Sequence, residues 1–109
     1  MRIGELARQA GVTTSRIRFY ESEGLLAAAA RSANGYRDYG PRDIKVIAFI
    51  ERAQRLGFSL KDIGAFLKRP ARAALVGSLK AKLAEIDAHI AEARRRRREI
   101  AALIAELAD

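Results

Sequence analysis

The sequence contains no cysteine and a single histidine among its 109 residues. Without cysteine the chain forms no disulfide and offers no thiolate to zinc or to an iron–sulfur cluster. His89 has no second histidine to help it hold a metal, and no Gly-rich phosphate loop or triad-like cluster accompanies it. The sequence therefore predicts no metal site, no cofactor and no enzymatic activity. Membrane-length apolar runs and a signal peptide are missing as well, which predicts a cytoplasmic protein without membrane contact.

Positive charge is present in excess, with 21 Lys or Arg against 13 Asp or Glu, a formal net charge of +8. Residues 1–69 carry 13 of these basic and 7 of these acidic side chains, whereas residues 70–109 carry 8 and 6. This balance points to a polyanionic partner, nucleic acid before an anionic membrane. A basic surface that only keeps the protein soluble is the alternative. If nucleic acid is the partner, its contacts belong mainly to the first part of the chain.

The first segments predict two short helices joined by a tight turn. Apolar residues at positions 3, 6, 7 and 10 follow the i, i+3, i+4, i+7 spacing of an amphipathic helix, which Gly11 ends. Thr13 or Thr14 can cap the second helix, which runs through SRIRFYESE to Gly24. Two short helices with a Gly-containing turn are typical of a helix-turn-helix.

A hairpin and two further helices are expected next. Asn34-Gly35 is a strong two-residue turn signal, and it predicts a small β-hairpin, or wing. Pro41 favours the start of a central helix over about residues 41–56, and Ser59 can cap another over 59–68. Pro70 then breaks the pattern. We therefore expect a head over residues 1–69, with a linker and a long helix over 70–109.

The segment from about residue 71 onward predicts one long helix that needs a partner. Its apolar positions recur in alternating steps of three and four over more than four heptads, and a lone helix with such a stripe is unstable in water. A second copy of the chain is the simplest partner. Arg97 falls inside the stripe, where it can fix register or orientation by pairing with an acidic residue of the other helix, or reach solvent. The predicted pairing residues are Leu79, Leu83, Ile86, Ile90, Ala93, Arg97, Ile100, Ile104 and Leu107.

The run Arg94–Arg98 suggests nucleic-acid binding at first sight. Five consecutive residues spread around more than one helical turn, so they form no single stripe. We interpret the run as part of the pairing surface.

Two clusters of residues are candidates for DNA contact. The N-terminal end of a recognition helix enters the major groove, so Thr14, Ser15, Arg16 and Arg18 are placed to reach bases or phosphates. Ordinary solvated helix charges are the alternative reading. Around the predicted turn, two cations and a tyrosine hydroxyl can donate to phosphate oxygens, unless Tyr36 packs inward. These wing residues are Arg31, Asn34, Gly35, Tyr36 and Arg37. Tyr39 is expected in the core.

Four segments resemble the MerR family of bacterial transcription regulators in order and spacing: IGELARQAGV, IRFYESEGLL, RSANGYRDYG and IERAQRLGFSLKDI. The resemblance implies a mainly α fold, a winged helix-turn-helix head followed by a long helix that pairs antiparallel with its twin. It makes residues 26–39 the first wing and the helix pair 41–56 and 59–68 a second one. It also carries DNA contacts over to Tyr20 and Arg55, and supports those at Arg16, Arg18, Arg31, Tyr36 and Arg37.

The resemblance implies a homodimer that binds a near-palindromic promoter operator and bends and undertwists it for RNA polymerase. The sequence departs from the family pattern at Ala27–Ala30, where relatives often have prolines, and at residues 70–78, which lack the cysteines of the metal and redox sensors. No C-terminal effector domain is expected. Two alternatives remain: a coiled-coil adaptor whose head docks on a protein, and an architectural or repressing DNA-binding protein without an inducer.

Overall fold

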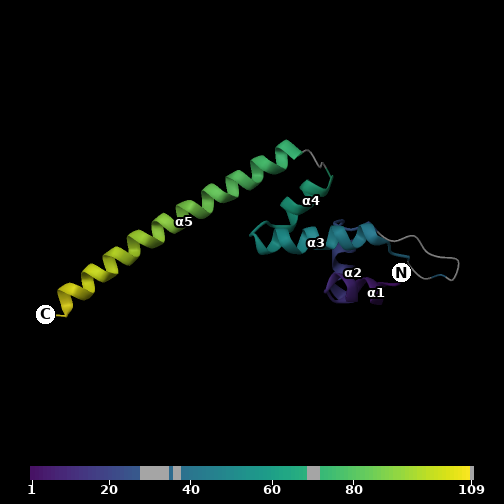
Figure 1. Ribbon diagram of the computed structural model, residues 1–109, viewed down its shortest axis with the longest axis horizontal. Helices are drawn as coiled ribbons and strands as arrows, with labels where there is room; N and C mark the ends of the chain where they lie inside the picture. The colour runs from purple at the N-terminus through teal and green to yellow at the C-terminus, as the bar shows by residue number, and fades with distance from the viewer. Residues whose placement is uncertain (28–34, 36–37, 69–71, 109) are drawn as a thin grey trace. The chain divides into compact units, whose positions relative to one another are not determined.

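The computed structural model describes residues 1–27, 35, 38–68 and 72–108, and its regular secondary structure over those ranges is helical (Figure 1). The helices are α1 (Ile3–Ala10), α2 (Thr14–Ser22), α3 (Pro41–Arg55), α4 (Leu60–Lys68) and α5 (Arg72–Leu107). The chain divides into two compact units, Met1–Arg69, called the head below, and Pro70–Asp109. The mainly α prediction is confirmed. Most of the predicted wing, residues 28–34 and 36–37, lies outside the described residues, so the wing stays a prediction.

Local signals fix the turn between α1 and α2. Gly11 adopts the left-handed conformation with φ 70°, which glycine reaches without strain, and its N–H donates to the Ala7 carbonyl. The hydroxyl of Thr13 then accepts a hydrogen bond from the Arg16 N–H at 3.1 Å. Thr13, rather than Thr14, is therefore the cap of α2.

The starts of α3 and α4 also follow from short-range chemistry. Pro41 is the first residue of α3, where its missing N–H costs nothing, and the Gly40 N–H donates to the Asp43 carboxylate at 2.8 Å. The Ser59 hydroxyl accepts from the Asp62 N–H at 3.1 Å and so caps α4. These contacts confirm both predicted helix starts.

The core of the head lies where α1 packs on α2 and α3, and α3 packs on α4. Each fully buried aliphatic side chain there contributes roughly 1.5–3 kcal/mol through removal from water. At Gly64 an added Cβ would meet the Leu25 side chain at 3.3 Å, so α4 approaches this core closely. The largest fully buried side chains are Tyr20, Leu6, Ile17, Ile47, Ile50 and Ile63.

Tyr39 ties the end of the predicted wing segment to the core. Its side chain is buried, as expected, and its hydroxyl donates to the Glu21 carboxylate at 3.0 Å. Its backbone N–H donates to the Met1 carbonyl at 2.8 Å, and the Met1 ammonium donates back to the Tyr39 carbonyl at 2.7 Å. The same ammonium pairs with Asp38 at 2.7 Å. The chain that follows the predicted wing is thus anchored beside α1 and α2.

The helix α5 has 36 residues and none of them is buried within Arg72–Leu107. A single uninterrupted helix was predicted here, and the structure confirms it. The predicted pairing residues are all exposed, but the pairing itself stays a prediction. None of the helices in the described ranges combines the length and apolar character needed to cross a membrane. The exposed large apolar residues of α5 are Val76, Leu79, Leu83, Ile86, Ile90, Ile100, Leu103, Ile104 and Leu107.

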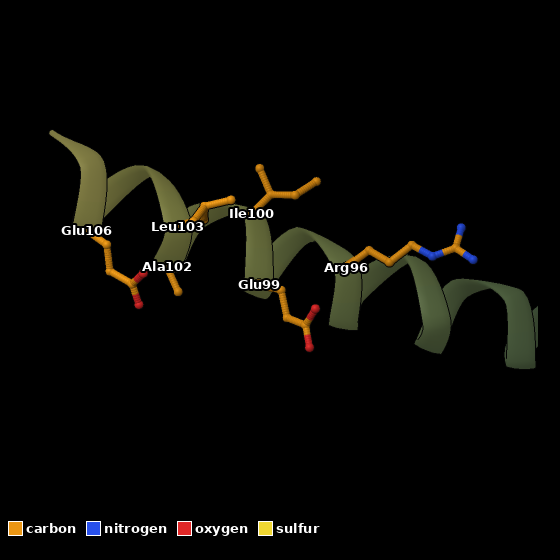
Figure 2. Close-up of a pocket in the computed structure, with 6 residues that line it drawn as sticks. All are labelled: Arg96, Glu99, Ile100, Ala102, Leu103 and Glu106. Atoms are coloured by element: carbon orange, nitrogen blue, oxygen red, sulfur yellow. The ribbon is translucent and has the colours of Figure 1, made fainter.

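A shallow recess near the C-terminal end of α5 is lined by side chains of that one helix (Figure 2). Ile100 and Leu103 project to one side, and Glu99, Ala102 and Glu106 to the other. Because one helix supplies every lining residue, the recess is an exposed helix surface rather than an enclosed cavity.

Candidate nucleic-acid interface

The outer face of α2 is the best candidate for contact with DNA. Ser15, Arg18, Phe19 and Ser22 are exposed and follow the i, i+3, i+4, i+7 spacing of a single helix face. The opposite side of the helix holds Ile17 and Tyr20, which are completely buried. Burial of that side fixes which residues α2 turns outward. We call Ser15, Arg18, Phe19 and Ser22 the outer face of α2.

The N-terminal end of α2 adds to this surface. Ser15 and Arg16 are exposed there, and Thr14 is partly buried. The first N–H groups of a helix lack intrahelical acceptors and carry partial positive charge, which suits a phosphate. The Thr13 hydroxyl already accepts the Arg16 N–H, so the free N–H donors of this turn are those of residues that precede Arg16. The predicted contacts Thr14, Ser15 and Arg16 are therefore brought together at one helix end.

Tyr20 was predicted to contact DNA, but the structure places its side chain inside the head. Its side chain has no exposed surface, and its hydroxyl lies 3.1 Å from both the Glu51 and the Gln54 side-chain oxygens on α3. Burial raises the pKa of the Tyr20 phenol above its usual value, and the negative charge of Glu51 raises it further. Tyr20 is therefore a positioning residue that holds α2 against α3.

Glu51 joins two of the predicted residues, and the sequence analysis missed it. One oxygen accepts from Arg16 Nη1 at 3.0 Å, and the other lies beside the Tyr20 hydroxyl. Because Arg16 is half exposed, this ion pair contributes little to stability, but it orients the guanidinium. The signal in the sequence was a Glu and a Gln three residues apart on an otherwise apolar face of α3.

Phe19 was also missed. Its side chain is 45% exposed. Its two neighbours, Arg18 and Tyr20, were predicted as DNA contacts, but Phe19 was passed over. The available signal was that Phe19 does not share the helix face of Ile17 and Tyr20. An exposed aromatic ring beside an arginine is suited to apolar contact with a nucleic acid as well as to stacking.

Two of the predicted DNA contacts, Arg18 and Arg55, have exposed side chains without an ionic partner among the described residues. Arg18 on α2 and Arg55 in the last turn of α3 are exposed, and no ion pair or side-chain hydrogen bond engages either of them among the described residues. Both keep their full set of donors for an external acceptor.

The wing contacts fall mostly outside the described residues, namely Arg31, Asn34, Tyr36 and Arg37. Gly35 is described and has φ 82°, a left-handed value that the predicted two-residue turn requires of glycine. The hairpin itself is not tested by this one angle.

These features define a class of protein: a helix-turn-helix head with a solvent-facing basic recognition helix, and a long helix with an uncovered apolar stripe. The chain matches the family described as MerR HTH family regulatory protein over residues 1–69, and that described as MerR, DNA binding over residues 44–109. The chain belongs to the MerR family of transcription regulators.

Several proteins are similar in sequence. The HTH-type transcriptional regulator CueR of Salmonella typhimurium strain LT2 is 33% identical over 108 residues, which cover 94% of this chain and 78% of CueR. The uncharacterized HTH-type transcriptional regulator PA4778 of Pseudomonas aeruginosa is 51% identical over 67 residues, or 62% of this chain. HmrR of Sinorhizobium medicae is 46% identical over 63 residues. The matched region spans 51% of PA4778 and 43% of HmrR, about half of each.

Solved structures agree with the fold. PbrR691 from Ralstonia metallidurans CH34, solved in complex with Lead(II), is 39% identical with a TM-score of 0.63, and the match covers 100% of this chain and 84% of PbrR691. HiNmlR, a MerR family regulator lacking the sensor domain and bound to promoter DNA, has a TM-score of 0.68 at 24% identity, with coverage of 88% and 76%. At that identity HiNmlR supports the fold alone.

Proposed function

We propose that this chain is a transcription regulator that binds a near-palindromic promoter operator as a homodimer and bends and undertwists it. The outer face of α2 carries the proposal, because Arg18 is exposed, unpaired and adjacent to a free helix N-terminus. Burial of Ile17 and Tyr20 behind it makes this face rigid. Recognition helices read base edges in the major groove with side chains of this kind.

Contacts to phosphates complete the proposed interface. Arginine and tyrosine side chains can donate to phosphate oxygens, which sets affinity and register rather than sequence choice. Arg16 and Arg55 are exposed on the head and suited to that role. The wing supplies the remaining proposed donors from Arg31, Asn34, Gly35, Tyr36 and Arg37.

Dimerisation through α5 is part of the proposal. An exposed apolar stripe on a 36-residue helix is covered most simply by a second copy. Bending DNA smoothly by 40–90° costs roughly 1–6 kcal/mol. Two joined heads can offset this cost, because both of them contact the bent duplex. RNA polymerase at the same promoter and a cytoplasmic location complete the function that family membership supports.

The direct test is DNA selection followed by substitution of one arginine. The wild-type protein is used to select duplexes from a random library, and affinity for the selected duplex is compared with affinity for a scrambled one at fixed salt. Arg18→Ala should weaken binding to the selected duplex about fivefold or more, since a good bidentate base contact is worth about 1–3 kcal/mol. Arg98→Ala, which removes the same charge from α5, is the control and should have little effect. No preference for any selected duplex would refute the proposal.

A further inference from the structure

The charged side chains of α5 divide into those with a partner on their own helix and those without. Lys82 lies 3.3 Å from Glu85, and Glu92 pairs with both Arg95 and Arg96. Two exposed residues near the middle of the helix take no part in such pairs. Within Arg72–Leu107 no ion pair engages Asp87 or Arg94.

Asp87 and Arg94 occupy equivalent places beside the apolar stripe. They are seven residues apart, so they repeat the same heptad position, one residue after Ile86 and Ala93 of the stripe. Positions that flank a coiled-coil seam form ion pairs between helices and set which helix pairs with which, and in what orientation. Residues at this one flanking position face each other across the seam only when the two helices are antiparallel, so Asp87 and Arg94 can pair with each other only in that orientation.

One antiparallel register accounts for the whole stripe. If Ile90 of one copy lies opposite Ala93 of a second copy, the other stripe residues also fall into matching layers. Two-fold symmetry repeats each layer once. The layers are Val76 with Leu107, Leu79 with Ile104, Leu83 with Ile100, and Ile86 with Arg97.

We propose that Asp87 of each copy pairs with Arg94 of the other across this antiparallel seam, and that these two ion pairs select the orientation and register of the dimer. The inference rests on the proposed homodimer. A slip by one heptad in one direction would place Arg94 opposite Arg94, and a slip in the other direction would place Asp87 opposite Asp87. A parallel alignment would place Arg97 against Arg97 inside the seam. Each of these alternatives sets like charges side by side, which is unfavourable.

The test is an exchange of charges measured by dimer dissociation. Asp87→Arg alone and Arg94→Glu alone each convert both pairs into repulsive ones and should weaken the homodimer by about tenfold. The double variant Asp87→Arg/Arg94→Glu restores the pairs in reverse and should recover most of the wild-type affinity. Mixing the two single variants should give heterodimers in clear excess over the statistical half. Arg98→Glu, on the outer side of the helix, is the matched control and should change little.

The outcomes separate this inference from the proposed function. A wild-type chain that stays monomeric at all concentrations would overturn both. A wild-type dimer whose double variant shows no recovery, or whose mixed single variants assort at random, would overturn the ion pair alone. Loss with Asp87→Arg but none with Arg94→Glu would also overturn it, since a parallel helix pair would place Asp87 near Lys82. Circular dichroism of each variant checks that α5 remains helical.

Discussion

In the head, Leu6, Ile17 and Ile47 have no exposed surface, whereas on α5 Leu83 and Ile104 leave 60% and 62% of theirs in contact with solvent. Leucine and isoleucine side chains therefore form the buried core of the head, whereas on α5 the same side chains are exposed to solvent. A helix draws most of its stability from packing of its apolar face. The difference indicates that the head is stable by itself, while α5 depends on association. This contrast can be tested on each side.

The largest effect is expected from Ile90→Asp. A carboxylate in the centre of the stripe would place two charges against apolar side chains in the dimer, which is strongly unfavourable. We expect a monomer by light scattering and much weaker binding to the selected duplex. Ala91→Asp, one residue along and on the outer side of α5, should remain dimeric. A dimeric Ile90→Asp protein would mean that the pairing surface is elsewhere.

On the other side of the comparison, Ile47→Ala should unfold the head more readily. Ile47 is fully buried, and removal of its methyl groups leaves a cavity that costs roughly 2–5 kcal/mol. The matched change Ile86→Ala removes the same atoms from a side chain that is 43% exposed. Thermal unfolding of both variants at one protein concentration measures the contrast. Equal destabilisation of the head by the two changes would contradict the independence of the two regions.

The sequence predicts most of this fold because its signals are local. Gly11, Thr13, Pro41 and Ser59 act within one helical turn, so the spacing of residues was enough to place the starts and ends of the four head helices. Tyr39 was also recognised as a core residue, and the burial confirms that prediction.

The burial of Tyr20 has a tertiary cause. A tyrosine can bind DNA through its hydroxyl or pack its ring in the core, and the residues next to Tyr20 in the sequence do not distinguish these two roles. Tyr20 is held in the core by contacts of its hydroxyl with Glu51 and Gln54, which lie 31 and 34 residues away along the chain. Phe19 was overlooked for the related reason that its exposure depends on how α2 is rotated against α3. Within α2 itself, the spacing shows only that Phe19 lies on another face than Ile17, and it does not show that Tyr20 is buried.

Phe19 provides a sharper test of the outer face of α2. If α2 enters the major groove as proposed, we expect the exposed ring of Phe19 to touch a thymine methyl group, a contact made by apolar side chains. Phe19→Ala should weaken binding to the selected duplex several-fold. Replacing thymines with deoxyuridine one at a time should weaken wild-type binding at one position in each half-site but leave the binding of Phe19→Ala unchanged there. Leu56→Ala removes another exposed apolar side chain of the head and is the control. If each thymine replacement weakened the binding of Phe19→Ala as much as that of the wild type, the thymine contact would be excluded.

The smallest effect concerns how firmly α2 is held on α3, and it appears at alkaline pH. The pKa of Tyr20 is raised in the folded head by burial and by Glu51, whereas in the unfolded chain the phenol titrates near 10. A raised folded pKa means that the contribution of Tyr20 to stability is fully present below about pH 10 and is lost as the pH rises through the folded pKa. The free energy of unfolding of the wild type should therefore fall relative to that of Tyr20→Phe above about pH 10. Urea unfolding of both proteins from pH 8 to 11 measures this difference, in which the other tyrosines and the lysines cancel. Parallel profiles would show that the hydroxyl is not confined between Glu51 and Gln54 in solution, and the positioning role of Tyr20 would then rest on its ring alone.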